Sequence, residues 1–187
     1  MEKVIVIGNG MVGYKFCEKL RAKATDKKIS LTVYGEEPLP AYDRVHLSEY
    51  FESQSEDKLL MAPRSWYDEH DIILKTSQLI TNIDRSHKTI TTHTGESESY
   101  DHLVLATGSS AMVPPIKGVD KKGVFVYRTI EDLDQIISYA KNAKSGAVLG
   151  GGLLGLEAAK ALMDLNLETK VIEFAPKLMP RQLDDAG

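Results

Sequence analysis

The sequence has little cysteine, no long apolar run and no excess of basic residues. Cys17 is the single cysteine of the 187 residues, so a disulfide within the chain and a Cys-x-x-Cys metal site are excluded. A chain without disulfides is typical of the cytoplasm, where we expect this protein. No stretch approaches the ~20 apolar residues of a membrane helix. The net charge of −4 gives no basic surface for binding nucleic acid.

Short apolar runs alternate with longer amphipathic stretches along the chain. Residues 4–7 and 147–149 suit buried strands, and the stretches after them, 11–22 and 153–165, suit helices. The buried face of the first helix is expected to consist of Val12, Phe16 and Leu20. Alternating strands and helices predict an α/β fold with parallel sheets. We therefore predict two Rossmann-like dinucleotide-binding units, of which the second is incomplete.

The first predicted strand runs into a Gly-x-Gly-x-x-Gly motif made of Gly8, Gly10 and Gly13. One glycine permits a tight turn, one lets the backbone approach a pyrophosphate, and one lets helix and strand pack closely. The helix that begins at Met11 directs unpaired N–H groups toward the phosphate. An acidic residue about 20 positions later accepts hydrogen bonds from ribose hydroxyls. Glu36 is the expected acid, and Glu37 is the alternative.

The motif recurs at Gly150, Gly152 and Gly155, again between a predicted strand and a predicted helix. Glu173 is the acidic residue that follows it. A carboxylate at this position accepts the adenosine 2′-hydroxyl and repels a 2′-phosphate, so we predict NADH rather than NADPH. The nearby basic residues Lys170 and Arg181 weigh against that preference.

With both motifs in place, the chain resembles the two-dinucleotide flavoprotein reductases, which include the glutathione, ferredoxin and rubredoxin reductases. The resemblance covers essentially the whole chain and implies that the first unit binds FAD and the second binds NAD(P)H. The segment YDHLVLATGS at residues 100–109 resembles the second FAD motif of that family. The further FAD-binding positions that the resemblance implies are Met11, Arg44, Ile80, Ala106, Thr107, Gly108 and Arg128. Arg44 could also be an ordinary surface charge.

One branch of the family fits best. The segments EEPLPAYDRVHLSEYF at residues 36–51 and VIEFAPKLMPRQLD at residues 171–184 resemble the large subunits of NADH-dependent nitrite reductases. This resemblance implies that NADH reduces FAD and that electrons then pass to iron–sulfur and siroheme centres. Those centres would lie in later domains, outside this chain, and would reduce nitrite to ammonia.

Three departures from other branches narrow the resemblance. The redox cysteine pair of the disulfide reductases is absent, and Cys17 suits a small core residue. Residues 41–43 contain no cysteine, although NADH peroxidases and oxidases have a catalytic one nearby. Glu49 stands where the ferredoxin-type reductases have a lysine near the flavin. The effect of that lysine on the flavin therefore does not carry over directly to this chain.

The resemblance also implies a division of the chain and a residue near the nicotinamide. We predict the first segment of an FAD-binding domain at residues 1–111, a linker at 112–123 and an NAD-binding domain at 124–187. Hydride transfer between cofactors requires no acid or base from the protein. Glu157 matches a glutamate that lies near the nicotinamide in relatives; alternatively, it only favours the helix dipole.

Two other functions remain open at this point. One is a stand-alone NADH-dependent reductase for rubredoxin or ferredoxin, and the other is a non-catalytic flavin- or NADH-binding module. The expected partners are NADH and downstream redox domains or an acceptor protein, and a homodimer is left open. In relatives the chain returns to complete the flavin site. We therefore expect this chain alone to bind FAD weakly and to oxidise little NADH.

Overall fold

The computed structural model describes residues 1–24, 29–180 and 182–184, and it divides the chain into two compact units. The first unit comprises Met1–Asp43 and Leu59–Ser110, and the second comprises Arg44–Lys58 and Ala111–Gly187. The predicted domains placed residues 44–58 in the first segment. The structure groups them with the second unit instead, because their aromatic side chains pack there.

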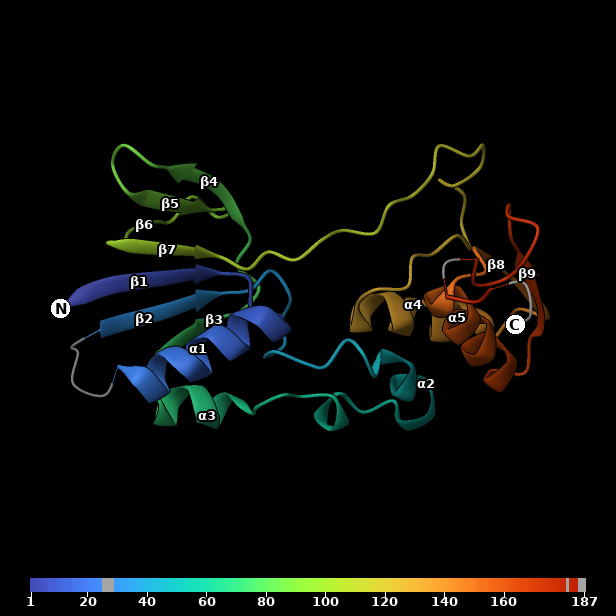
Figure 1. Cartoon of the computed structure of the whole chain (residues 1–187), viewed down its shortest axis with the longest axis horizontal. Helices are drawn as coiled ribbons and strands as arrows, with labels where there is room; N and C mark the ends of the chain where they lie inside the picture. Colours follow the sequence, from blue (N-terminus) through green and yellow to red (C-terminus); the bar gives the residue numbers. More distant parts are fainter. Residues whose placement is uncertain (25–28, 181, 185–187) are drawn as a thin grey trace. The chain divides into compact units, whose positions relative to one another are not determined.

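A four-stranded parallel sheet organises the first unit. Its order is β3 (Ile72–Lys75), β2 (Ile29–Tyr34), β1 (Glu2–Ile7) and β7 (His102–Leu105). The helices α1 (Met11–Lys23) and α3 (Arg64–Glu69) lie on one face of this sheet (Figure 1). Between the helices and the sheet lies a core that includes Val4, Val6, Leu31, Val33, Tyr14, Cys17 and Tyr67. The predicted α/β fold with a parallel sheet is thereby confirmed.

Helix α1 turns a different face to the sheet than its sequence suggested. Tyr14 and Cys17 are buried, and Phe16 and Leu20 pack against the core, but the Val12 side chain is 70% exposed. The prediction for Val12 was wrong because successive helical residues point about 100° apart, and the stripe through residues 13, 14 and 17 faces the sheet. Burial raises the pKa of the Cys17 thiol to about 12, as expected for a core residue.

An antiparallel sheet covers the other face of the parallel sheet (Figure 1). Its strands, in order, are β4 (Ile80–Asp84), β5 (Thr89–Thr92) and β6 (Ser97–Ser99). A second apolar cluster lies between the sheets and includes Ile5, Ile7, Tyr34 and Ile90. The first unit is thus a three-layer structure whose central sheet is buried on both faces.

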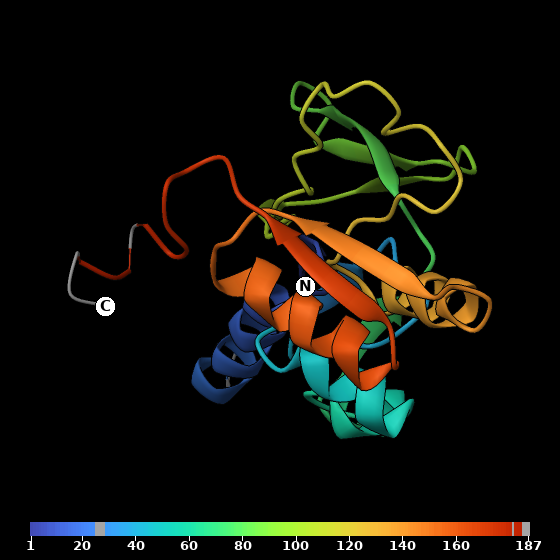
Figure 2. The same ribbon diagram turned by 90° about the vertical axis from the view of Figure 1, so that its right-hand side faces the viewer.

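The second unit contains two parallel strands, β8 (Ser145–Leu149) and β9 (Glu168–Ile172), with α5 (Leu153–Asp164) packed on them (Figure 2). Its other elements are η1 (Leu47–Glu49), α2 (Tyr50–Ser53), η2 (Glu56–Lys58) and α4 (Ile130–Ala140). Tyr50 donates a hydrogen bond to Asp134 of α4 (2.8 Å), and the Phe51 ring stacks on Tyr127 with centroids 6.0 Å apart. These contacts hold residues 44–58 in this unit.

Across the described part of the chain, no helix combines the length and the apolar character needed to span a bilayer.

Candidate dinucleotide-binding sites

The first glycine corner joins the end of β1 to the start of α1. Gly8 has φ +109°, a conformation that side-chain-bearing residues rarely adopt. Its N–H donates to the carbonyl of Tyr34 (2.8 Å), which ties the corner to the end of β2. A Cβ at Gly8 would overlap the carbonyl oxygen of Ala106. The turn therefore requires glycine both for its conformation and for its closeness to the segment after β7.

The other two glycines of this corner have different surroundings. A Cβ at Gly13 would overlap the carbonyl oxygen of Gly8, whereas a Cβ at Gly10 would meet no atom within 4 Å. Gly13 thus permits close packing of helix and strand, and Gly10 faces open space. A ligand phosphate needs that space to approach the N–H groups at the start of α1. The corner therefore has the geometry that a bound dinucleotide requires.

The second FAD motif lies beside this corner. Ala106 donates its N–H to the carbonyl of Ile7 (2.8 Å), and it is followed by the exposed residues Thr107 and Gly108. Gly108 has φ +67°, so the backbone turns here as well. The structure thus brings six of the predicted FAD-binding residues together: Gly8, Gly10, Gly13, Ala106, Thr107 and Gly108.

Of the two candidate ribose acids, one is already engaged. The Glu37 carboxylate accepts a hydrogen bond from the Tyr42 hydroxyl (2.6 Å). Glu36 is exposed directly after β2, and no residue in the described ranges bonds to its carboxylate. This arrangement favours Glu36 as the ribose acid. Ile80, by contrast, packs against the apolar cluster between the sheets, and its contact with a cofactor stays a prediction.

The second glycine corner repeats this geometry between β8 and α5. Gly150 has φ +113° and donates its N–H to the carbonyl of Ile172 (2.9 Å). A Cβ at Gly155 would overlap the carbonyl oxygen of Gly150, just as a Cβ at Gly13 would overlap that of Gly8. Cβ atoms at Gly150 and Gly152 would meet nothing within 4 Å. This corner also has open space in front of a helix N-terminus.

Glu173 follows β9 and reaches back to the second corner. Its carboxylate accepts hydrogen bonds from the N–H groups of Gly151 (2.6 Å) and Ala175 (2.7 Å). Hydrogen bonds from Ala175 and Gly151 hold the pKa of Glu173 below its ordinary value. Each carboxylate oxygen has a second lone pair with which it could accept a ribose hydroxyl. Glu173 is therefore both a structural anchor and a candidate ribose acid.

Lys170 and Arg181 are the two basic residues near Glu173 that weigh against the preference for NADH. Lys170 pairs with Glu168 at 3.3 Å on the exposed face of β9. Arg181 lies outside the described residues. The preference for NADH therefore stays a prediction that rests on Glu173.

Three further predicted site residues, Arg44, Arg128 and Glu157, also belong to the second unit. Arg44 donates a hydrogen bond from Nη1 to the carbonyl of Arg128 (2.9 Å). Burial raises the pKa of Tyr127, and the negative charge of Glu157 raises it further. Glu157 therefore lies in the electrostatic neighbourhood of Tyr127. That Arg44 and Arg128 contact FAD stays a prediction.

The sequence profile of the pyridine nucleotide-disulphide oxidoreductases matches residues 2–186. The chain belongs to this family. The resemblance to flavoprotein reductases is thereby confirmed, although the chain lacks the cysteine pair that the family name implies. Its single cysteine, Cys17, lies in α1 and is buried against the sheet. With no second cysteine, the chain has no internal dithiol.

The relatives of this chain include the nitrite reductase (NADH) large subunit of Escherichia coli K12. That protein is 49% identical over 185 residues, which are 99% of this chain and 22% of the relative. Large subunits of this kind support the predicted branch. The chain spans about a fifth of the length of the curated relatives it matches.

Solved structures agree with the fold. The NADH:rubredoxin oxidoreductase of Clostridium acetobutylicum superposes with a TM-score of 0.86 at 29% identity, over 100% of this chain and 48% of that one. The water-forming NADH oxidase of Lactobacillus brevis, solved with bound NADH, gives a TM-score of 0.88 at 25% identity. It covers 100% of this chain and 42% of that one. Both superpositions support the α/β fold with a parallel sheet.

Sequence reasoning missed Asn9, the residue between the first two glycines of the first corner. The Tyr67 hydroxyl donates to Oδ1 of Asn9 (3.1 Å) and accepts from the N–H of Ala41 (3.4 Å). Asn9 Nδ2 is buried and has no hydrogen-bond partner among the described residues. A polar side chain between two motif glycines was the signal that could have identified this residue.

Proposed function

We propose that this chain is the NADH-oxidising flavoprotein part of a cytoplasmic nitrite reductase. The first unit would bind FAD and the second NADH, and electrons would pass to siroheme and iron–sulfur centres outside this chain. The observation that carries the proposal is the repeated glycine corner, with open space at Gly10 and at Gly152. The 49% identity to the NADH nitrite reductase large subunit of E. coli supports nitrite as the final acceptor.

The residues of each corner bind and orient a cofactor. N–H groups at the starts of α1 and α5 face the pyrophosphates, and Glu36 and Glu173 accept the ribose hydroxyls. The backbone of Ala106–Gly108 approaches the FAD phosphates beside Gly8. When bound, FAD and NADH supply the hydride chemistry, and the protein contributes their relative orientation.

The remaining assignments follow the family resemblance. Met11, Ile80, Arg44 and Arg128 are assigned to FAD, and Glu157 is assigned to the surroundings of the nicotinamide. The hydrogen bond between Arg44 and the Arg128 carbonyl supports a joint role, because movement of one residue would shift the other.

Stopped-flow reduction of the full-length protein tests the proposal. We expect NADH to bleach the flavin absorbance under anaerobic conditions, and steady-state NADH oxidation to require nitrite and to yield ammonia. Bleaching without nitrite-dependent turnover would contradict the nitrite assignment and favour a stand-alone rubredoxin or ferredoxin reductase. No bleaching of a flavin-loaded protein would contradict any NADH oxidoreductase and favour a non-catalytic binding module.

A further inference from the structure

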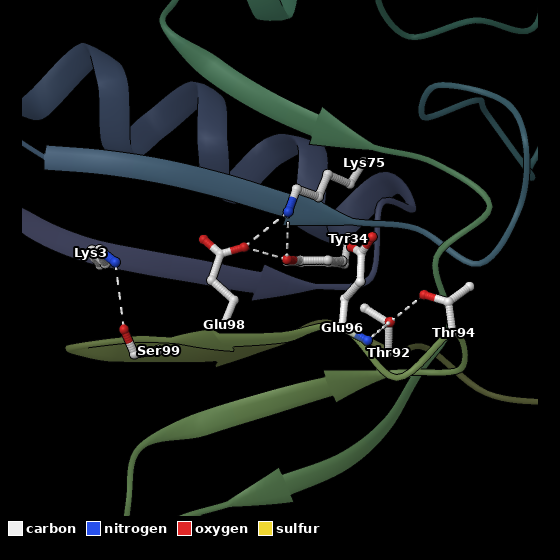
Figure 3. A network of polar contacts seen from close by, with 8 residues as sticks. All are labelled: Lys3, Tyr34, Lys75, Thr92, Thr94, Glu96, Glu98 and Ser99. Atoms are coloured by element: carbon white, nitrogen blue, oxygen red, sulfur yellow. Dashed lines mark hydrogen bonds and ion pairs between the residues drawn. The ribbon is translucent and has the colours of Figure 1, made fainter.

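A polar triad joins the two sheets of the first unit (Figure 3). It consists of Tyr34 at the end of β2, Lys75 at the end of β3 and Glu98 in β6. Tyr34 donates its hydroxyl proton to Glu98, and Lys75 Nζ donates to the Tyr34 oxygen (3.0 Å) and to Glu98 Oε2 (3.0 Å). The Tyr34 residue is 2% exposed, and the side chains of Lys75 and Glu98 are partly exposed, at 36% and 29%.

The charges of the triad reinforce one another. Burial pushes the pKa of Glu98 upward, but hydrogen bonds from Tyr34 and Lys75 outweigh it and hold that pKa below its ordinary value. The hydrogen bond to Tyr34 raises the pKa of Lys75. Glu98 is therefore anionic and Lys75 cationic at neutral pH. Hydrogen bonds between ionised groups are stronger than neutral ones, so the triad restrains all three side chains.

The main chain of the same residues holds the first glycine corner. The Tyr34 carbonyl accepts from Gly8 (2.8 Å), and the Lys75 carbonyl accepts from Gly35 (2.9 Å). Gly8 begins the phosphate corner, and Gly35 precedes the ribose acid Glu36. The two residues that support the corner are thus fixed through their side chains to β6 of the antiparallel sheet.

We propose that Tyr34, Lys75 and Glu98 are positioning residues that couple FAD binding at the first corner to the antiparallel sheet. This inference rests on the proposed function of the first unit as the FAD site. A ligand that orders Gly8 and Gly35 also orders the carbonyls to which they are bonded, and through the triad it orders β6. Because coupling between two sites is reciprocal, the triad in turn strengthens FAD binding.

Substitution of Tyr34 by phenylalanine in the full-length protein tests the coupling. Tyr34→Phe keeps the ring but removes the hydroxyl that bridges Lys75 and Glu98. Since one such hydrogen bond has a modest net free energy, we expect FAD to bind about 3- to 10-fold more weakly. The matched control is Tyr14→Phe, which removes the hydroxyl of another buried tyrosine whose bond to Glu18 (3.4 Å) stays within α1. FAD affinity should not change in this control.

Hydrogen exchange separates coupling from a merely structural role. In the wild type, FAD should slow exchange of the β6 amides, and in Tyr34→Phe this effect of FAD should be reduced, because only the bond from Lys75 to Glu98 remains. A triad that only stabilises the fold would change β6 exchange equally with and without FAD. If Tyr34→Phe does not fold, Lys75→Met, at a side chain that is 36% exposed, removes the cation instead and should give the same two results.

Two outcomes overturn the inference differently. A wild type that binds FAD, with variants that keep its affinity and its FAD-dependent protection of β6, would overturn the coupling alone. A wild type that binds no FAD would overturn the proposed function and the coupling with it.

Discussion

The two glycine corners share one contact but are packed differently. In each, the last glycine lies against the carbonyl of the first, so helix and strand approach equally closely. At the first corner, Gly8 also presses on the main chain of Ala106, which follows a strand remote in sequence. At the second corner, no atom lies within 4 Å of a Cβ at Gly150. The first glycine of the motif is therefore constrained by a third segment in one unit but not in the other.

The residue between the first two glycines is also held differently. In the first corner, a neutral hydroxyl of Tyr67 binds the Asn9 side chain. In the second corner, the Glu173 carboxylate binds the Gly151 N–H. One corner thus has a neutral anchor and the other an ionised anchor, which gives the two units different responses to substitution and to pH.

Replacement of the first glycine should produce the largest difference between the corners. Gly8→Ala adds a Cβ at positive φ, which strains the backbone by about 1–3 kcal/mol, and forces it onto Ala106, which adds about 1–3 kcal/mol. We expect the first unit to lose about 4 kcal/mol. Gly150→Ala should cost only the strain, about 2 kcal/mol. Denaturant-dependent hydrogen exchange in β1 and β8 measures each unit separately, and equal losses would contradict the packing difference.

Replacement of the middle glycine should weaken cofactor binding more than folding. A Cβ at Gly10 meets no protein atom, so Gly10→Ala should cost less than about 1 kcal/mol of stability as an N-cap change. It occupies the space for the pyrophosphate, so FAD should bind at least about tenfold more weakly. Gly152→Ala should weaken NADH binding instead and leave FAD affinity intact. Isothermal titration with each cofactor would reveal any loss at the wrong corner.

Neutralising the ionised anchor should change the choice of nicotinamide cofactor. Glu173→Gln removes the charge that repels a 2′-phosphate and replaces one acceptor with a donor. We expect NADH to bind about 3- to 10-fold more weakly and the NADPH to NADH ratio of kcat/KM to rise. Glu168→Gln, on the exposed side of the same strand, is the matched control and should leave both values unchanged. An unaltered cofactor ratio in Glu173→Gln would refute its role as the ribose acid.

The contacts of Glu173 and Tyr67 should lose stability in opposite directions of pH. We expect this effect to be smaller than those of the substitutions above. The pKa of Glu173 is lowered in the fold, so its contribution to stability is present above the ordinary pKa and is lost as pH falls through the lowered value. Burial raises the pKa of Tyr67 to about 12, so its contribution is lost as pH rises from about 10 toward 12. Hydrogen exchange should show that acid loosens the Gly151 amide, which Glu173 binds, and that alkali loosens the Ala41 amide, which Tyr67 binds. Loss of both corners at the same pH would contradict this assignment.

The sequence alone was sufficient for the corners but not for their packing. Strand, glycine motif, helix and acidic residue follow one another within short segments, so local patterns located Gly8, Gly150 and the α/β fold. The contact of Tyr67 with Asn9 joins residues far apart in the chain, and no periodicity reports such a pair. For the same reason, the contact of Tyr34 with Glu98 of the antiparallel sheet was not predictable. The roles of these positions in binding cofactors stay predictions.

The grouping of residues 44–58 escaped prediction for a related reason. The structure forms η1, α2 and η2 in this segment. Their packing partners, Asp134 and Tyr127, come from the later part of the chain. Sequence adjacency placed the segment with its neighbours, whereas burial of Tyr50 and Phe51 placed it in the second unit.

The placement of residues 44–58 in the second unit has a practical consequence for the design of shortened forms of the chain. The chain leaves the first unit after Asp43 and re-enters it at Leu59. These two residues are joined by a backbone hydrogen bond of 2.8 Å, and Tyr42 bridges Leu60 in antiparallel register. A simple truncation at Ser110 would expose Tyr50 and Phe51 to water, because their packing partners lie later in the chain. Joining Asp43 to Leu59 through a tight turn would instead remove residues 44–58. The main chain on either side of this cut is already held together by the hydrogen bond between Asp43 and Leu59.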